Sequence, residues 1–243
     1  MIQSVDIMDR LKADTRELHD QAESHPFQSR LVKGELSRGG YCNYLNAMYH
    51  VHQALESELM EAGGSNPTVG EFPYESRFRV EAVRRDLAYF ERDPSVLPVL
   101  EPVSDLCGQL NKTRLNAPCS LLGHLYVLEG SSNGTRFIAR GVRRAYRLNG
   151  TDGTAYLDPY GDNHRSEWAL FKVQMRALEL SAATADQIVD GAKAMFSGIT
   201  MISDALLEVE SAGKGISTKS SKNRMPKLSS ELTPETRIIE AVV

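Results

Sequence analysis

Apolar positions recur every three to four residues along most of the chain, whereas the strict alternation typical of β-strands is almost absent. The longest stripe lies within residues 38–62, and Ser37 stands just before it, where a helix N-cap is expected. Its apolar side chains are Tyr41, Tyr44, Leu45, Met48, Val51, Leu55 and Leu59. This pattern predicts a long amphipathic helix and an all-α chain.

The same spacing predicts shorter helices on both sides of this segment. They cover residues 7–23, 26–33, 75–91, 101–114, 165–180 and 184–211, and another begins near Pro118. The glycine- and proline-rich segments 63–74 and 149–164 predict loops. From Gly213 onward lysine, serine, threonine and glycine prevail, which predicts a flexible tail. We expect one domain of about eight helices, residues 1–212, and a tail, residues 213–243.

Composition narrows the function classes. A chain of 243 residues with 41% apolar residues is long enough for a single large core, and its net charge of -4 gives no argument for nucleic-acid binding. No window approaches the roughly 18 apolar residues of a membrane-spanning helix, and the mixed charges at the N-terminus argue against a signal peptide. Cys42, Cys107 and Cys119 form no C-x-x-C motif. These features predict a cytoplasmic protein that binds neither nucleic acid nor membrane.

One histidine shares a helical face with a carboxylate. His19 lies four residues before Glu23 and seven after Lys12, so the three side chains lie near one side of the predicted helix. Two interpretations are open: a partly buried histidine paired with Glu23, or a metal ligand that Glu23 orients. The residues alone favour the first.

The segment EGSSNG, residues 129–134, places two glycines four residues apart inside a helical pattern. Each glycine costs roughly 1 kcal/mol relative to alanine in a helix interior, yet the flanking sequences keep helical spacing and contain no proline. Either the helix kinks here, or a large flat group approaches the backbone at Gly130 and Gly134. Ser131, Ser132 and Asn133 offer hydrogen-bonding groups to water or to a ligand.

Four segments together resemble the heme oxygenase family. They are LKADTRELHDQAESHPF, KGELSRGGYCNYLNAMYHVHQALESEL, YVLEGSSNG and AKAMFSGI, in this order within residues 8–210. The Glu-Gly-Ser sequence is common in bacterial, biliverdin-producing members. The resemblance implies an all-α, single-domain heme oxygenase-like bundle that holds heme between a proximal histidine helix and a glycine-rich distal helix. Dioxygen and electrons then open heme to biliverdin, carbon monoxide and ferrous iron, with the alpha cut as the default.

The resemblance also implies residue roles. His19 matches the axial iron ligand, Glu23 the acid that orients it, and Phe196 an aromatic residue that lines the pocket. The distal segment of the family matches Gly130, Ser131, Ser132, Asn133 and Gly134, and the contacts to the heme propionates match Lys12, Tyr126, Lys172 and Arg176. Asn133 and Thr135 replace residues that are often small or apolar in bacterial members, which bears on the distal water network.

An electron donor is implied as well: ferredoxin, flavodoxin or an NAD(P)H-dependent reductase. The basic run RGVRRAYR, residues 140–147, is a candidate docking surface, and a solvated helix face is the alternative. A carrier or sensor that binds heme without degrading it remains a second functional hypothesis. A di-iron site is disfavoured because the chain has no Glu-x-x-His motif. His25, His50, His52, His124 and His164 are interpreted as structural residues.

Overall fold

The structure is a computed structural model that describes residues 6–217, with side-chain surroundings up to Gly213. Within these residues the chain is helical and contains no strand. The α-helices are α1 (Ile7–Ser24), α2 (Pro26–Lys33), α3 (Arg38–Gly63), α4 (Pro67–Gly70), α5 (Val80–Tyr89), α6 (Glu101–Asn116), α7 (Ser120–Tyr146), α8 (His164–Ala177) and α9 (Ala182–Ser217). Two short 3₁₀ helices, Tyr74–Arg77 and Gly161–Asn163, precede α5 and α8. The predicted all-α fold is confirmed.

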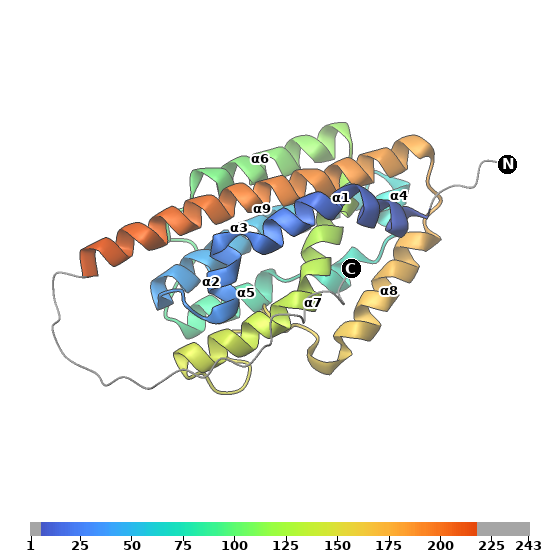
Figure 1. The fold of residues 1–243 in the computed structure, drawn as a ribbon. Coiled ribbons are helices and arrows are strands. Elements are labelled where there is room, and N and C mark those ends of the chain that lie inside the picture. Colours follow the sequence, from blue (N-terminus) through green and yellow to red (C-terminus); the bar gives the residue numbers. More distant parts are fainter. Residues whose placement is uncertain (1–5, 218–243) are drawn as a thin grey trace.

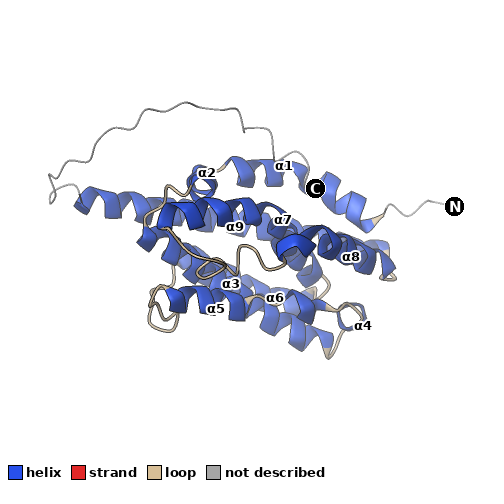
Figure 2. Cartoon of the chain, turned by 90° about the horizontal axis from the view of Figure 1, so that it is seen from below, coloured by secondary structure: helices blue, strands red, loops and turns tan. Residues whose placement is uncertain are grey.

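The helices stack in three tiers. Helix α9 runs the length of the molecule, with α1 along one side of it and α6 along another (Figure 1). Seen from below, α1 and α2 form one tier, α7, α8 and α9 the middle tier, and α3, α5 and α6 the third (Figure 2). The proximal and distal helices expected from the sequence therefore belong to neighbouring tiers.

Local sequence signals account for several helix ends. The Asp6 carboxylate accepts hydrogen bonds from the Met8 and Asp9 backbone N–H groups, at 2.8 and 3.3 Å, and so caps α1. Ser37 caps α3 as predicted, because its hydroxyl accepts from the Gly40 N–H at 2.9 Å. Gly34 ends α2 in the left-handed conformation, with φ of 67°.

Two predicted segments were wrong in detail. The predicted helix 75–91 is divided, because Phe78 is extended and the buried Glu56 carboxylate accepts hydrogen bonds from the backbone N–H groups of Arg79 and Val80. This long-range cap starts α5 at Val80. The predicted loop 63–74 contains the short helix α4, which Asn66 caps through its side chain at 3.1 Å.

The end of the domain was predicted at residue 212. Helix α9 continues to Ser217, and the remainder of the expected tail, residues 218–243, lies outside the described residues. The tail therefore stays a prediction.

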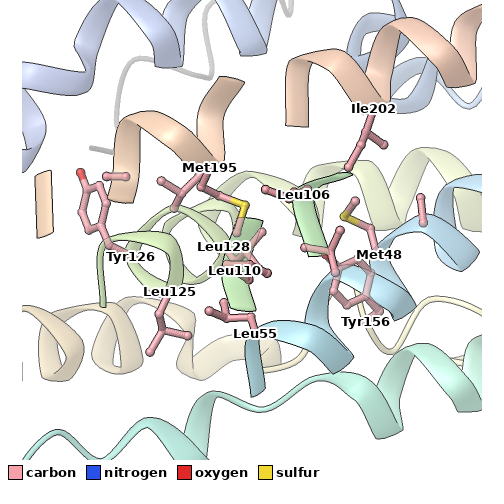
Figure 3. Packing of buried hydrophobic residues seen from close by; sticks show 14 of the residues in the cluster. Met48, Leu55, Leu106, Leu110, Leu125, Tyr126, Leu128, Tyr156, Met195 and Ile202 are labelled. Atoms are coloured by element: carbon pink, nitrogen blue, oxygen red, sulfur yellow. The ribbon is translucent and has the colours of Figure 1, made fainter. Parts of the chain in front are cut away.

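The close crossing of α7 and α9 centres the core. A Cβ atom on Gly123 would overlap the Ile188 carbonyl oxygen, and one on Gly191 would overlap the Ser120 carbonyl oxygen. These two glycines let the backbones touch, so that side chains of α7, α9, α3 and α6 pack beside the crossing (Figure 3). Among them are Leu125, Leu128, Met195, Leu55 and Leu110. The crossing fixes the first half of α7, which leads directly into the EGSSNG segment.

Candidate functional site

His19 lies on α1 with its ring against an aromatic ring of α9. The centroids of His19 and Phe196 are 6.0 Å apart at an angle of 81°, an edge-on contact, and the histidine side chain is 34% exposed. From the sequence, only the family resemblance indicated that His19 and Phe196 belong to one site, and the structure places their rings in contact. An imidazole held on one edge and open on another can accept a ligand.

Two carboxylates flank the His19 ring. Its Nδ1 atom lies 3.4 Å from Asp20 and 3.8 Å from Glu23. The distance to Glu23 is short enough for an ion pair but too long for a hydrogen bond. Glu23, which the sequence predicted to orient His19, is therefore adjacent to the ring but does not hydrogen-bond it. The ligand atoms of His19, Asp20 and Glu23 lie within 4.8 Å of one another, the arrangement of a potential cation site. All three are at least partly exposed.

Polar contacts hold α1 along α9 on both sides of His19. Arg10 pairs with Asp186 at 2.5 Å, and the His25 ring contacts the Asp204 carboxylate at 3.0 Å. His25 also accepts the Phe27 N–H at 3.1 Å through Nδ1 and so caps α2. The helix that carries His19 is therefore fixed at both ends, which suits a residue that must hold a ligand in one place.

The EGSSNG segment remains helical but bends. Three side chains turn back onto carbonyl oxygens three residues earlier: Ser131 to Leu128 at 2.7 Å, Asn133 to Gly130 at 3.1 Å, and Thr135 to Ser132 at 3.3 Å. Such back-bonding bends helices, and α7 changes direction in its middle (Figure 1). The Ser131 and Asn133 side chains, expected to face water or a ligand, bind their own helix in this structure.

The two glycines of the segment differ in their surroundings. Among the described residues, a Cβ atom on Gly134 would meet no atom within 4 Å apart from the backbone of its own helix, whereas one on Gly130 would lie 3.5 Å from the tip of the Trp168 ring. Packing against neighbouring protein atoms does not explain the missing side chain at Gly134. Bare backbone beside open space is what a flat macrocycle requires for close approach, so Gly134 fits heme.

Three aromatic rings surround the start of this segment. Tyr126 of α7 is buried, which raises its pKa to about 12, and it shares a hydrogen bond with Thr15 of α1. The ring centroid of Trp168, on α8, lies 5.8 Å from that of Tyr126, and the Trp168 ring stacks on Phe171 with the centroids 5.2 Å apart. The Lys172 amino group lies 5.9 Å from the centre of the Trp168 ring. The predicted residues Tyr126 and Lys172 thus come together where α1, α7 and α8 meet.

The other two predicted propionate contacts have different surroundings. Arg176 is bound by the carboxylates that start α1, Asp6 at 2.5 Å and Asp9 at 3.7 Å. Lys12 is an exposed residue of α1. These acids already neutralise much of the Arg176 charge, so Arg176 is less available than Lys172 to bind another anion.

A buried charged network behind the distal glycines was missed from the sequence. Glu129, immediately before Gly130, accepts hydrogen bonds from Arg77 and Arg79 at 3.2 Å each and from the Tyr160 hydroxyl at 2.6 Å. The side chains of Arg77 and Glu129 are only 1% and 2% exposed. The sequence did offer one signal, because Glu129 follows a run of helix with four buried leucines, where an acidic residue needs a partner. No local pattern identified Arg79 and Arg77, which lie 50 and 52 residues earlier, as those partners.

The network also reaches α8. Arg77 donates to Glu167 at 3.0 Å and to Gln174 at 3.3 Å, so it connects the distal helix with the helix that carries Lys172. A cavity of about 10 Å³, the size of one water molecule, lies among His52, Arg79, Glu129, Ser131 and Ser132. A water there would link the network to the distal serines.

The remaining histidines have partners of their own, although the Nε2 atom of His50 has none among the described residues. His52 contacts the Tyr156 hydroxyl at 3.3 Å, and the Arg136 guanidinium contacts His164 at 2.7 Å. Buried His124 donates to the Ser120 carbonyl oxygen at 2.8 Å, and burial lowers its pKa to about 4. These contacts agree with structural roles for all three.

The basic run at residues 140–147 is partly engaged. Arg143 donates to Thr154 at 2.8 Å and pairs with Asp158 at 3.4 Å, while Arg140, Arg144 and Arg147 are exposed.

No described helix is long and apolar enough to span a bilayer.

Comparisons with known proteins agree on the family. The heme oxygenase family model matches residues 5–204. Heme oxygenase 2 of Oryctolagus cuniculus is 28% identical over 232 residues, which cover 93% of this chain and 73% of that protein. Two solved structures share the fold. Heme oxygenase-1 of Synechocystis, in complex with heme, has a TM-score of 0.79, 20% identity, and coverage of 88% of this chain and 98% of that one.

The second is the heme oxygenase of Leptospira interrogans, with a TM-score of 0.76, 22% identity, and coverage of 83% of this chain and 100% of that one. At these identities the solved structures show the fold alone, whereas the family match spans most of the chain. The chain therefore belongs to the heme oxygenase family, the oxidoreductases that cleave heme to biliverdin, carbon monoxide and ferrous iron.

Proposed function

We propose that heme is cleaved between α1 and α7, with His19 as the axial ligand of the iron and the Gly130–Gly134 segment on the opposite side of the macrocycle. The observation that carries this proposal is the open space at Gly134, for which neighbouring protein atoms supply no reason. The His19 ring, partly exposed and held edge-on by Phe196, supports it from the other side.

The proximal residues hold and orient the ligand. A neutral imidazole is the usual proximal ligand of heme iron, and a nearby carboxylate fixes its ring and tunes its basicity. Glu23, one helical turn from His19, is placed for this role with a small movement of its side chain. Phe196 restricts rotation of the imidazole and supplies apolar surface to the macrocycle.

The distal residues leave room and hold water. Gly130 and Gly134 keep the backbone bare, so that only a small molecule such as dioxygen fits above the iron. Ser131 and Ser132 lie beside the one-water cavity, where their hydroxyl groups can order water as a proton source, and Asn133 offers an amide on the same turn of the helix. No charged distal side chain is needed for this arrangement.

Cationic side chains near α8 bind the propionates. Lys172 lies beside Trp168 and, within the part of the chain that the structure describes, has no acidic partner of the kind that engages Arg176, so it is the readier contact. Tyr126 offers a hydroxyl close by, and Lys12 contributes from α1. Charge-assisted hydrogen bonds of this type set the in-plane rotation of heme and thereby the position of the ring cut.

We also propose dioxygen as co-substrate and ferredoxin, flavodoxin or an NAD(P)H-dependent reductase as electron donor, in the cytoplasm. The free thiols of Cys42, Cys107 and Cys119 agree with a reducing compartment. The exposed arginines of the 140–147 run, Arg140, Arg144 and Arg147, are the available part of a docking surface for an acidic donor.

A hemin titration followed by turnover tests the proposal. The purified chain is titrated with hemin and then given ascorbate or a ferredoxin system in air, with His19→Ala in parallel. We expect a Soret band that decays as biliverdin absorption rises, and a loss of both in the variant. A stable Soret band without ring opening would indicate a carrier or sensor, and an unchanged spectrum in His19→Ala would exclude His19 as ligand.

A further inference from the structure

A second cavity, of about 130 Å³, lies among α3, the segment before α6, and the last part of α9. Its wall includes Asn46 and His50 of α3 and Val209 of α9. Val209 is 13 residues beyond Phe196 on α9, which is about 20 Å along the axis and about 140° around it. The cavity is thus separate from the proposed heme site and lies on another face of α9.

Two buried acceptors in this wall have no partner among residues 6–217. Asn46 is 5% exposed, and its amide nitrogen donates to the Pro98 carbonyl oxygen at 3.0 Å, which fixes the orientation of the amide and leaves its Oδ1 atom unpaired. The Nε2 atom of His50 is also buried and unpaired. A buried polar atom without a partner is destabilising, so a group that binds both atoms is favoured.

The state of the His50 ring follows from its other contact. The ring hydrogen-bonds the Pro94 carbonyl oxygen, which only an N–H group can do, and burial lowers the pKa of His50. Burial keeps the ring neutral, with one proton; we assign that proton to Nδ1, which leaves the unpaired Nε2 atom with its lone pair. Asn46 and His50 therefore present two acceptors one helical turn apart.

Apart from Asn43, the rest of the wall is apolar. Leu100 and Val103 close the inner side, while Val99 and Val209, 42% and 40% exposed, stand where the cavity meets solvent. Among the described residues none that lines the cavity carries a charged side chain. A cavity of about 150 Å³ accommodates a benzene molecule in another protein, so a ligand with a ring-sized apolar body fits here.

We propose that this cavity binds a small neutral molecule with a ring-sized apolar body and two adjacent O–H or N–H donors, which pair with Asn46 Oδ1 and His50 Nε2. The donors satisfy both buried acceptors, and the ring lies against the valine and leucine side chains. This site is independent of heme and is tested on the heme-free chain.

Catechol and o-xylene form the matched pair of probes, because two hydroxyl groups replace two methyl groups on the same ring. Each is titrated anaerobically into the full heme-free chain, and NMR follows the Asn46 side-chain amide, the His50 ring and the Val99 and Val209 methyl groups. We expect saturable shifts at these groups with catechol, at an affinity at least roughly fivefold above that for o-xylene.

Three variants complete the test. Val209→Phe fills the cavity and should abolish the shifts, His50→Leu should remove most of the preference for catechol, and Val173→Phe, an exposed change on α8, should alter nothing. Thermal unfolding confirms that each variant folds. Absence of shifts with both probes means that water alone fills the cavity, and equal affinity for both means that the acceptors bind no donor. Either outcome overturns the proposal.

Discussion

Arg77 and Glu129 form an ion pair at 3.2 Å that is almost fully withdrawn from solvent, directly before the first distal glycine. The pair joins the turn before α5 to the middle of α7 and, through Glu167, to α8. Two buried arginines share the Glu129 carboxylate, so removal of its charge leaves two cations without their common partner.

We predict that Glu129→Gln lowers the free energy of unfolding by about 3 kcal/mol or more, because breaking a buried pair leaves an uncompensated buried charge. The control is Glu81→Gln: the Glu81 carboxylate pairs with Arg84 on the surface, so its loss should leave the free energy of unfolding nearly unchanged. Denaturant titration of both variants measures the difference. Equal stabilities would show that the Glu129 network contributes little to the fold.

The glycines of α7 should separate into two classes. Gly123→Ala pushes a methyl group into the Ile188 backbone of α9 and should destabilise the chain by about 2–3 kcal/mol. Gly134→Ala meets open space, so its stability should be unchanged or higher by up to about 1 kcal/mol, while heme turnover falls because the methyl group occupies the distal side. Thermal unfolding and biliverdin formation are measured on both. Normal turnover in Gly134→Ala contradicts the assignment of the distal face.

The two carboxylates near His19 should differ in effect. Glu23 lies one helical turn from His19, whereas Asp20 is the next residue and projects about 100° away around the helix. We predict that Glu23→Gln weakens heme binding about tenfold, as for other residues that orient a metal ligand, and that Asp20→Asn has little effect. Hemin titrations decide the matter, and a larger effect of Asp20→Asn would assign the orienting role to that residue instead.

His124 should make the fold sensitive to acid. Its pKa is about 4 in the folded chain because of burial, against an ordinary value of 6.5. The unfolded chain therefore takes up a proton first, so stability is lost as pH falls from about 6.5 to about 4, by up to roughly 3 kcal/mol.

His124→Asn keeps a donor toward the Ser120 carbonyl oxygen but does not titrate. Its unfolding free energy should be lower at pH 7.5, because the smaller side chain leaves a void, and should fall less steeply between pH 6.5 and 4.5 than that of the unchanged chain. Denaturant titrations across this range give both slopes, and parallel slopes would mean that other groups cause the acid sensitivity.

Local signals predicted much of the fold, and long-range contacts account for what they missed. Ser37 and Gly34 mark helix ends through bonds within a few residues, and the structure confirms both. The break at Phe78 depends on Glu56, more than twenty residues away in the chain, so no local pattern revealed it.

The site shows the same division. Helical spacing indicated that His19 and Glu23 share a face of the helix. The contact between His19 and Phe196 joins residues 177 positions apart, so it was expected only from the family resemblance. The Glu129 network was not expected at all, because buried arginine–glutamate pairs carry no periodic signal.

Trp168 is the one tryptophan in the sequence, and its ring lies against Gly130 between Tyr126 and Phe171. The unlabelled chain thus contains an intrinsic fluorophore at the proposed reaction site. Energy transfer to a bound, strongly absorbing tetrapyrrole quenches the Trp168 fluorescence, and the fluorescence returns when the tetrapyrrole leaves. Arrival of substrate and release of product can therefore be timed separately from chemistry, in a stopped-flow instrument and without any modification of the protein.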